Sequence, residues 1–166
     1  MENTQNVGLM DALNGLIRIN NDRISGYQKA SKETKDEDLK ILFSGMLNES
    51  VNFAENLAGY VQELGGEATQ EGTIGGNVHQ AWLNFKSALL GHDREAILNS
   101  CEFGDKAAIE AYQTAMNLDA IQHHTELQGV LLRQCANLQS SLKIIESVNI
   151  RMKSNRAEQE TLERMG

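Results

Sequence analysis

Apolar residues recur every three or four positions over most of the chain, which is the spacing of one face of an α-helix. The pattern predicts four long helices, over residues 8–32, 37–64, 94–117 and 120–152, and a shorter helix over residues 77–90. Asp36 and Asp93 stand where helix N-caps are expected, and Gly65-Gly66 ends the second helix. The chain has no proline, which favours long uninterrupted helices joined by tight turns.

The connection between the second and third long helices sets the predicted topology. It spans about 25 residues, whereas a plain antiparallel neighbour needs only about 2–8. We therefore expect an all-α, ferritin-like four-helix bundle with a long crossover containing a short fifth helix, in a domain over residues 7–152. Residues 153–166 are of mixed charge and are expected to form a frayed or disordered C-terminal tail.

Each long helix carries one polar residue inside its apolar stripe. Each of these residues lies about 15 positions, or roughly 22 Å, from the turn of its hairpin, so the four are expected to meet at mid-height. With two nearby tyrosine hydroxyl groups they would form a buried, hydrogen-bonded polar layer that fixes helix register. The predicted layer consists of Asn20, Ser50, Asp105, Gln134, Tyr27 and Tyr112.

Di-metal carboxylate bundles build their site at the same level. In these proteins two helices each give a Glu, and the other two each give Glu-x-x-His. Here Asn52 and Asn137 stand at the two histidine places, and Gln134 stands at one glutamate place. The remaining carboxylates are those of Glu49, Glu102 and Asp105, which are few for cations that need several charged oxygen ligands.

The composition of the chain indicates which partners and which cellular compartment to expect. The formal net charge is -8 and the pI is near 5.0. Such an acidic surface repels nucleic acids and anionic membranes, so neither is expected as a partner. The N-terminal residues lack a signal-peptide pattern, and no apolar run approaches the roughly 18 residues of a membrane span. Cys101 and Cys135 are therefore expected as reduced thiols in a cytoplasmic protein.

Three stretches resemble a bacterial family of small ferritin-like four-helix-bundle proteins of unknown function. They are residues 13–17 followed by Asn21-Asp22-Arg23, then Gly75-Gly76-Asn77-Val78-His79-Gln80-Ala81-Trp82, and then Cys101-Glu102-Phe103-Gly104-Asp105 with Tyr112. The last is similar to a family pattern of Cys-Glu-x-Gly-Glu/Asp, then Ala, then Tyr. The resemblance covers about residues 9–145. It implies the ferritin-like fold, supplies no activity or catalytic residue, and places a family histidine at His79. Asp22 also matches, and we expect it to cap or pair with the crossover helix.

These observations lead to one preferred function and two alternatives. We expect a non-enzymatic bundle without a cofactor, whose polar layer stands in place of a di-metal site. Its role would be structural or in binding, with a link to stress left open, a homodimer plausible and any other protein partner unidentified. One alternative is an iron- or manganese-binding protein, in metal handling or as an oxidoreductase, that uses Glu49, Glu102 and Asp105 with His79. In the other, the short helix or the acidic surface docks a partner protein through Trp82.

Overall fold

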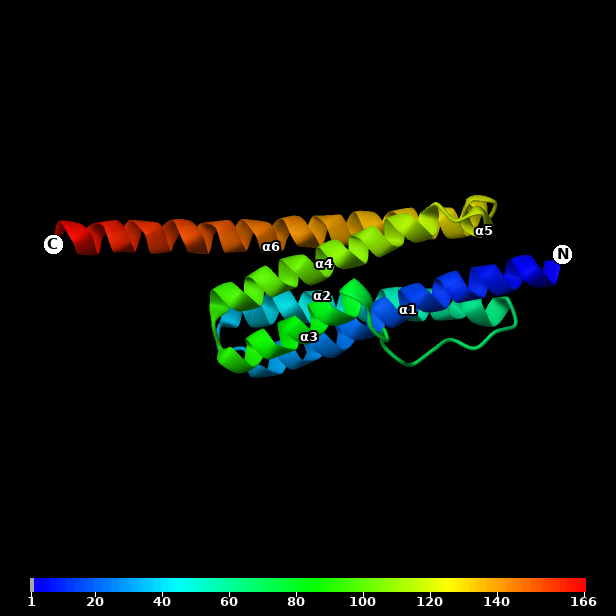
Figure 1. Ribbon diagram of the computed structural model, residues 1–166, viewed down its shortest axis with the longest axis horizontal. Coiled ribbons are helices and arrows are strands. Elements are labelled where there is room, and N and C mark those ends of the chain that lie inside the picture. The colour runs from blue at the N-terminus through cyan, green and yellow to red at the C-terminus, as the bar shows by residue number, and fades with distance from the viewer. Residues whose placement is uncertain (1) are drawn as a thin grey trace.

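The computed structural model describes residues 2–166, with side chains from Thr4 onward, as six α-helices without a strand in that range (Figure 1). The helices are α1 (Glu2–Glu33), α2 (Glu37–Glu63), α3 (Gly76–Gly91), α4 (Arg94–Met116), α5 (Asp119–Gln122) and α6 (Thr125–Met165). Among these described residues, we find no helix that combines the length and the apolar character needed to cross a bilayer.

Two antiparallel helix pairs make up the bundle. One pair is α1 with α2 and the other is α4 with α6, and α3 lies in the crossover between them, packed against α4 and α1. The apolar core has two parts, one that includes Leu13, Leu57 and Leu131 and one that includes Phe43 and Phe85. The two long hairpins, and the crossover with its short helix, agree with the prediction.

The crossover segment, residues 64–75, is held against α1 by polar side chains of that helix. The side-chain amide of Asn14 donates to the carbonyl of Glu67 at 3.1 Å, and its oxygen accepts from the backbone N–H of Thr69 at 3.0 Å. Asp22 accepts from both the backbone N–H and the hydroxyl group of Thr73. The partner of Asp22 is therefore the loop that precedes α3, and not the crossover helix itself.

The structure differs from the predicted helix over residues 120–152 at both ends. At its start, α5 is a separate turn, and His124 acts as the N-cap of α6 because its Nδ1 accepts from the backbone N–H of Leu127 at 3.2 Å. At its end, α6 continues to Met165 through the residues expected as a frayed or disordered tail. Its last turns contain no helix breaker and are rich in Ala, Glu, Gln, Leu and Arg, which are strong helix formers.

Trp82 anchors α3 to the bundle. Its indole is only 2% exposed and packs edge-on against Tyr27, with the ring centroids 5.1 Å apart. Glycines on both neighbouring helices make room for the ring. A Cβ at Gly26 of α1 would lie 2.7 Å from Trp82 Cε3, and one at Gly104 of α4 would lie 3.0 Å from Trp82 Cζ2. The glycine of the Cys-Glu-x-Gly-Asp stretch thus has a packing role, and Trp82 does not face solvent as docking through it would require.

We expect Gly26→Ala to lower the free energy of unfolding by about 1–3 kcal/mol, because the added methyl group overlaps a buried aromatic ring. Urea unfolding followed by circular dichroism would measure the change. The matched control is Gly45→Ala in α2, where nothing lies within 4 Å of the added Cβ. That substitution should raise stability by up to about 1 kcal/mol through helix propensity. Equal effects of the two variants would contradict the packing role of Gly26.

Candidate functional site

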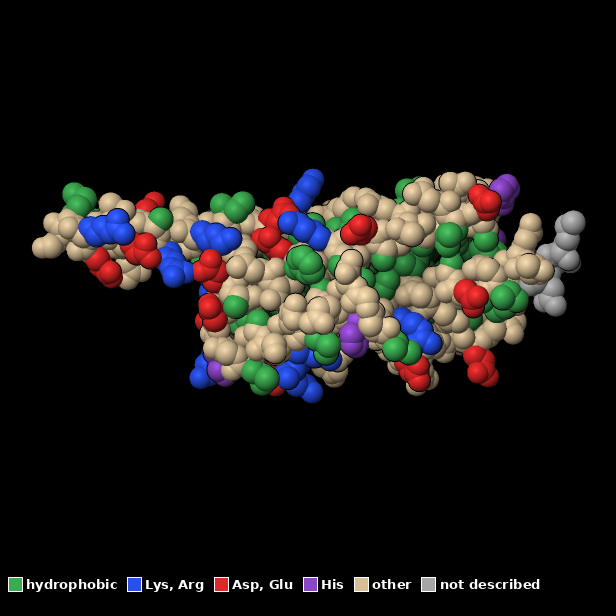
Figure 2. Space-filling view, viewed as in Figure 1, with side chains coloured by type: hydrophobic (Ala, Val, Ile, Leu, Met, Phe, Trp, Pro, Cys, Tyr) green, Lys and Arg blue, Asp and Glu red, His purple; other side chains and the backbone are tan. Residues whose placement is uncertain are grey.

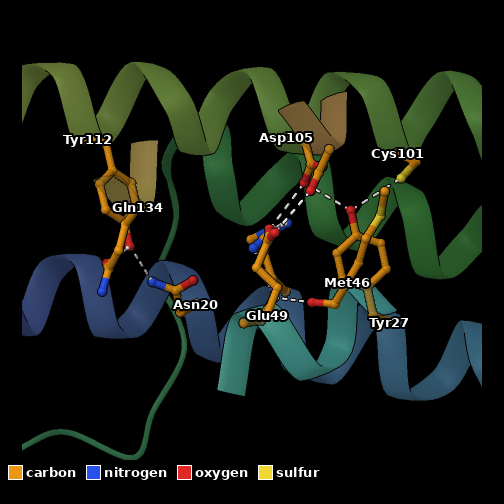
Figure 3. Close-up of polar contacts among 11 residues, drawn as sticks. Asn20, Tyr27, Met46, Glu49, Cys101, Asp105, Tyr112 and Gln134 are labelled. Atoms are coloured by element: carbon orange, nitrogen blue, oxygen red, sulfur yellow. Dashed lines mark hydrogen bonds and ion pairs between the residues drawn. The ribbon is translucent and has the colours of Figure 1, made fainter. Parts of the chain in front are cut away.

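A fully buried arginine occupies the centre of the bundle. Arg23 of α1 has no exposed surface, and its guanidinium group donates hydrogen bonds to three side chains. The acceptors are Asp105 Oδ1 on α4 at 3.1 Å, Ser50 Oγ on α2 at 2.9 Å, and Glu49 Oε1 on α2 at 3.3 Å. Figure 3 shows Glu49 and Asp105 reaching toward one another from these two helices. We refer to Arg23 and the groups bonded to it as the arginine cluster.

The charge of Arg23 is retained despite its burial. Loss of hydration alone would lower its pKa, but the carboxylate of Asp105, with smaller contributions from Tyr27 and Glu49, raises the pKa above its usual value. A guanidinium group does not lose its proton in proteins under ordinary conditions. The cluster therefore contains a permanent cation between two carboxyl groups.

Tyr27 and Cys101 complete the cluster on one side. The Tyr27 hydroxyl group donates to Asp105 Oδ1 at 2.9 Å and lies 3.2 Å from the Cys101 sulfur. Because the hydroxyl group has a single hydrogen, the thiol must donate to the tyrosine oxygen. Burial, followed by the nearby charge of Asp105, raises the pKa of both Tyr27 and Cys101. Both groups are thus held protonated, and Cys101 is a poor nucleophile.

Glu49 connects the cluster to the fourth long helix. Its second oxygen accepts from Ser141 Oγ of α6 at 3.0 Å. Burial raises the pKa of Glu49, and the charge of Arg23 opposes that rise only in part. Ser50, next to it in α2, donates its own hydrogen to the carbonyl of Met46 at 2.8 Å. Side chains from α1, α2, α4 and α6 are therefore joined in one network.

A second, uncharged cluster lies beside the arginine cluster (Figure 3). Asn20 Nδ2 donates to the Tyr112 hydroxyl group at 2.8 Å, which donates to Gln134 Oε1 at 2.7 Å. The amide of Gln134 in turn lies 3.5 Å from Asn56 Oδ1. Burial is the main cause that raises the pKa of Tyr112. These contacts link α1, α4, α6 and α2 through neutral groups.

The six residues of the predicted polar layer lie in two adjacent groups. All six residues are at most 5% exposed, namely Asn20, Ser50, Asp105, Gln134, Tyr27 and Tyr112. Asn20 and Gln134 bond to each other through Tyr112, whereas Ser50 and Asp105 bond to Arg23. The sequence pattern does not identify Arg23 as part of this layer, although Arg23 is fully buried. The available signal was spacing, since Arg23 lies three residues after Asn20 and four before Tyr27.

The proposed metal ligands are not gathered at one point. Glu49 and Asp105 share Arg23, but Glu102 accepts from Asn149 Nδ2 at 2.9 Å and lies 3.9 Å from Lys106 Nζ. His79 is half-buried on α3 and forms no hydrogen bond with these carboxylates in the described chain. Over residues 4–166, no three His, Cys, Asp or Glu side chains form a group suited to a metal ion. These residues do not fit a di-metal centre, because the guanidinium group of Arg23 lies between the carboxyl groups of Glu49 and Asp105.

Comparisons with known proteins give a family and a fold. A family model described as "Domain of unknown function (DUF2383)" matches residues 9–118. A crystal structure described as "ferritin like, diiron-carboxylate proteins" from Bacillus anthracis str. Ames is similar, with a TM-score of 0.69 and 16% sequence identity. The match covers 87% of this chain and 97% of that one, and it confirms the predicted ferritin-like fold. The search of curated proteins gave no match.

We expect Arg23→Met to lower the free energy of unfolding by about 3–5 kcal/mol, because the carboxyl group of Asp105 would lose its buried counter-charge. The double variant Arg23→Met/Asp105→Asn should lower the free energy of unfolding by less than the sum of the two single variants, and we expect a difference of roughly 1–3 kcal/mol. The matched control is Arg18→Met, whose ion pair with Glu71 is exposed to solvent and should cost about 1 kcal/mol or less. Equal losses for Arg23→Met and Arg18→Met in urea unfolding would disprove the importance of the buried pair.

Stability should also depend on the protonation of Glu49. Because its pKa is raised in the folded protein, the folded state holds this proton more tightly than the unfolded chain does. The resulting contribution is fully present below the ordinary glutamate pKa and is lost as the pH rises through the raised value. Relative to Glu49→Gln, the wild-type chain should therefore gain stability between about pH 7 and about pH 4. The matched control is Glu55→Gln, at an exposed position of the same helix.

Proposed function

This chain belongs to the family described as Domain of unknown function (DUF2383), and we propose that its ferritin-like bundle works without a bound metal. In this proposal the arginine cluster stands in place of a di-metal centre. The protein then has a structural or binding role and is not an enzyme. The observation that carries the proposal is the fully buried guanidinium group of Arg23 between Glu49 and Asp105.

Electrostatics support this assignment. A metal-carboxylate centre is stable because cations neutralise carboxylates that would otherwise repel one another. Here a side chain already supplies the positive charge, at 3.1 Å from Asp105 and 3.3 Å from Glu49. A divalent ion placed between the same oxygens would lie beside a fixed like charge, and it would have to displace two hydrogen-bonded contacts. The positive charge that neutralises Glu49 and Asp105 thus comes from Arg23 and not from a metal ion.

The chemistry of the surrounding groups fits a role without catalysis. Tyr27 and Cys101 have raised pKa values, so neither is activated as a base or a nucleophile. The cluster joins α1 to α2 and α4. The hydrogen bond between Ser141 and Glu49 extends it to α6. Each of these hydrogen bonds forms only when the helices are aligned at one position along their axes, so the cluster fixes the register of the helices. A bundle with a fixed register offers a rigid surface for binding.

One observation favours the alternative of iron or manganese binding. Asp105 Oδ2 is buried and has no hydrogen-bond partner in the described chain, which leaves one oxygen open to a ligand. Binding by Glu49, Glu102 and Asp105 would require Arg23 to leave its position and Glu102 to leave Asn149. The two proposals therefore differ in where Arg23 lies, and a metal measurement separates them.

We expect the untagged chain to retain far less than one ion of iron, manganese or zinc after incubation with each metal and desalting, as measured by plasma mass spectrometry. Near-stoichiometric metal that disappears in Asp105→Ala would refute the proposal and support the alternative. Arg23→His provides a positive test, since it removes the cation and adds a ligand beside Glu49 and Asp105. It should gain a Co²⁺ absorption band that Arg23→Met, which removes the cation without adding a ligand, does not show.

A further inference from the structure

The end of α6 projects beyond the rest of the bundle as a single helix (Figure 1). Residues 153–165, which we call the overhang, are exposed on every side. The last polar contact of α6 with another helix is the ion pair between Arg156 and Glu95 of α4. A helix segment of this length that is held by few contacts with other helices is only marginally stable in water. A partner that covers one face of the overhang would therefore stabilise this part of the helix.

The face of α6 that points away from the bundle carries a regular pattern. Ile150, Ser154, Ala157 and Thr161 follow one another at spacings of four, three and four residues, which is the spacing of a coiled-coil seam. Ile150 is 66% exposed and the other three are also exposed. The small side chains in the middle of this seam allow a second helix to approach closely.

The charges beside the seam are complementary to those of an identical helix running the other way. Basic residues, Arg151 and Lys153, lie near its start, and acidic residues, Glu158 and Glu160, lie near its end. Figure 2 shows side chains of both signs along the overhang. In an antiparallel pair, Lys153 would meet Glu160 of the second copy, and Arg151 would meet Glu158. Two-fold symmetry forms each of these contacts twice.

A parallel pair is less favourable for two reasons. It would place Lys143 opposite Lys143, and Arg164 opposite Arg164, because these residues continue the seam at its two ends. It would also bring two bundles, each of formal net charge -8, side by side. In the antiparallel arrangement the bundles lie at opposite ends of the paired helices. The like charges within the seam and the net charge of the bundles thus favour the antiparallel orientation.

We propose that the seam of α6 from Ile150 to Thr161 is a dimerisation surface, which pairs antiparallel with the same surface of a second copy of this chain. The pairing does not depend on the arginine cluster or on metal. Of the four flanking charges, only Glu160 has an ion-pair partner among residues 4–166, a contact of 3.6 Å with Arg156 of its own helix. Arg151, Lys153 and Glu158 are thus free to pair across the interface.

Sedimentation equilibrium of the full chain would test the surface. We expect a monomer–dimer equilibrium that weakens as salt is added, because the pairing charges are exposed. The variants R151E/K153E and E158K/E160K should each dimerise at least about tenfold more weakly, since every contact becomes a repulsion. An equimolar mixture of the two variants should restore the dimer, because each supplies the charges that the other lacks.

Two controls make the result specific. Glu163→Lys reverses a charge on the opposite side of the overhang and should leave the dissociation constant unchanged. Far-UV circular dichroism should show that all variants keep their helix content. A wild-type chain that stays monomeric at every accessible concentration would overturn the proposal. So would a mixture of the two variants that associates no more strongly than either variant alone.

Discussion

A positive charge that can neither lose its proton nor reach water must be neutralised by the protein around it. Arg23 is in this position, and the contacts that satisfy it come from Ser50, Glu49 and Asp105 on two other helices. Moving α1, α2 or α4 by one turn would separate these groups by about 5.4 Å and leave a buried charge unpaired, at a cost of several kcal/mol. The two apolar parts of the core can tolerate small shifts, because hydrophobic contact is not directional. The contacts of Arg23 cannot, so they constrain the relative heights of α1, α2 and α4.

The ferritin-like bundle of this chain encloses two kinds of polar contact. The Bacillus anthracis structure is described as a diiron-carboxylate protein, whereas this chain has a guanidinium group and neutral amides in its interior. In this chain, the polar groups buried between the two hairpins must be paired. Neutral hydrogen bonds pair these groups around Tyr112, and an internal ion pair does so around Asp105. At 16% identity, the similarity reaches the arrangement of helices and goes no further.

Much of the fold could be read from the sequence because its signals are local. Asp36, Gly65-Gly66 and Asp93 mark helix ends, and the long segment between two hairpins requires a crossover. The buried polar positions were also visible, because Asn20, Ser50, Asp105 and Gln134 interrupt apolar stripes. The burial of Arg23 was not visible in the sequence, because an arginine on a helix is normally exposed. Only three-dimensional packing reveals that Asp105 and Ser50 lie within its reach. The break at His124 was missed for a similar reason. An imidazole acts as a cap only when the backbone N–H groups of the next turn are presented to it, as that of Leu127 is here.

The packing of Trp82 between Gly26 and Gly104 gives the protein a built-in optical probe. It is the only tryptophan in the chain, and its ring, which belongs to α3, packs against both α1 and α4. Its fluorescence therefore reports whether α3 is seated on the bundle, independently of the total helix content. If α3 lifts away while the four long helices stay intact, the emission should move to longer wavelength with little change in circular dichroism. Partial and complete unfolding of this bundle can thus be distinguished in one cuvette, without attaching a label.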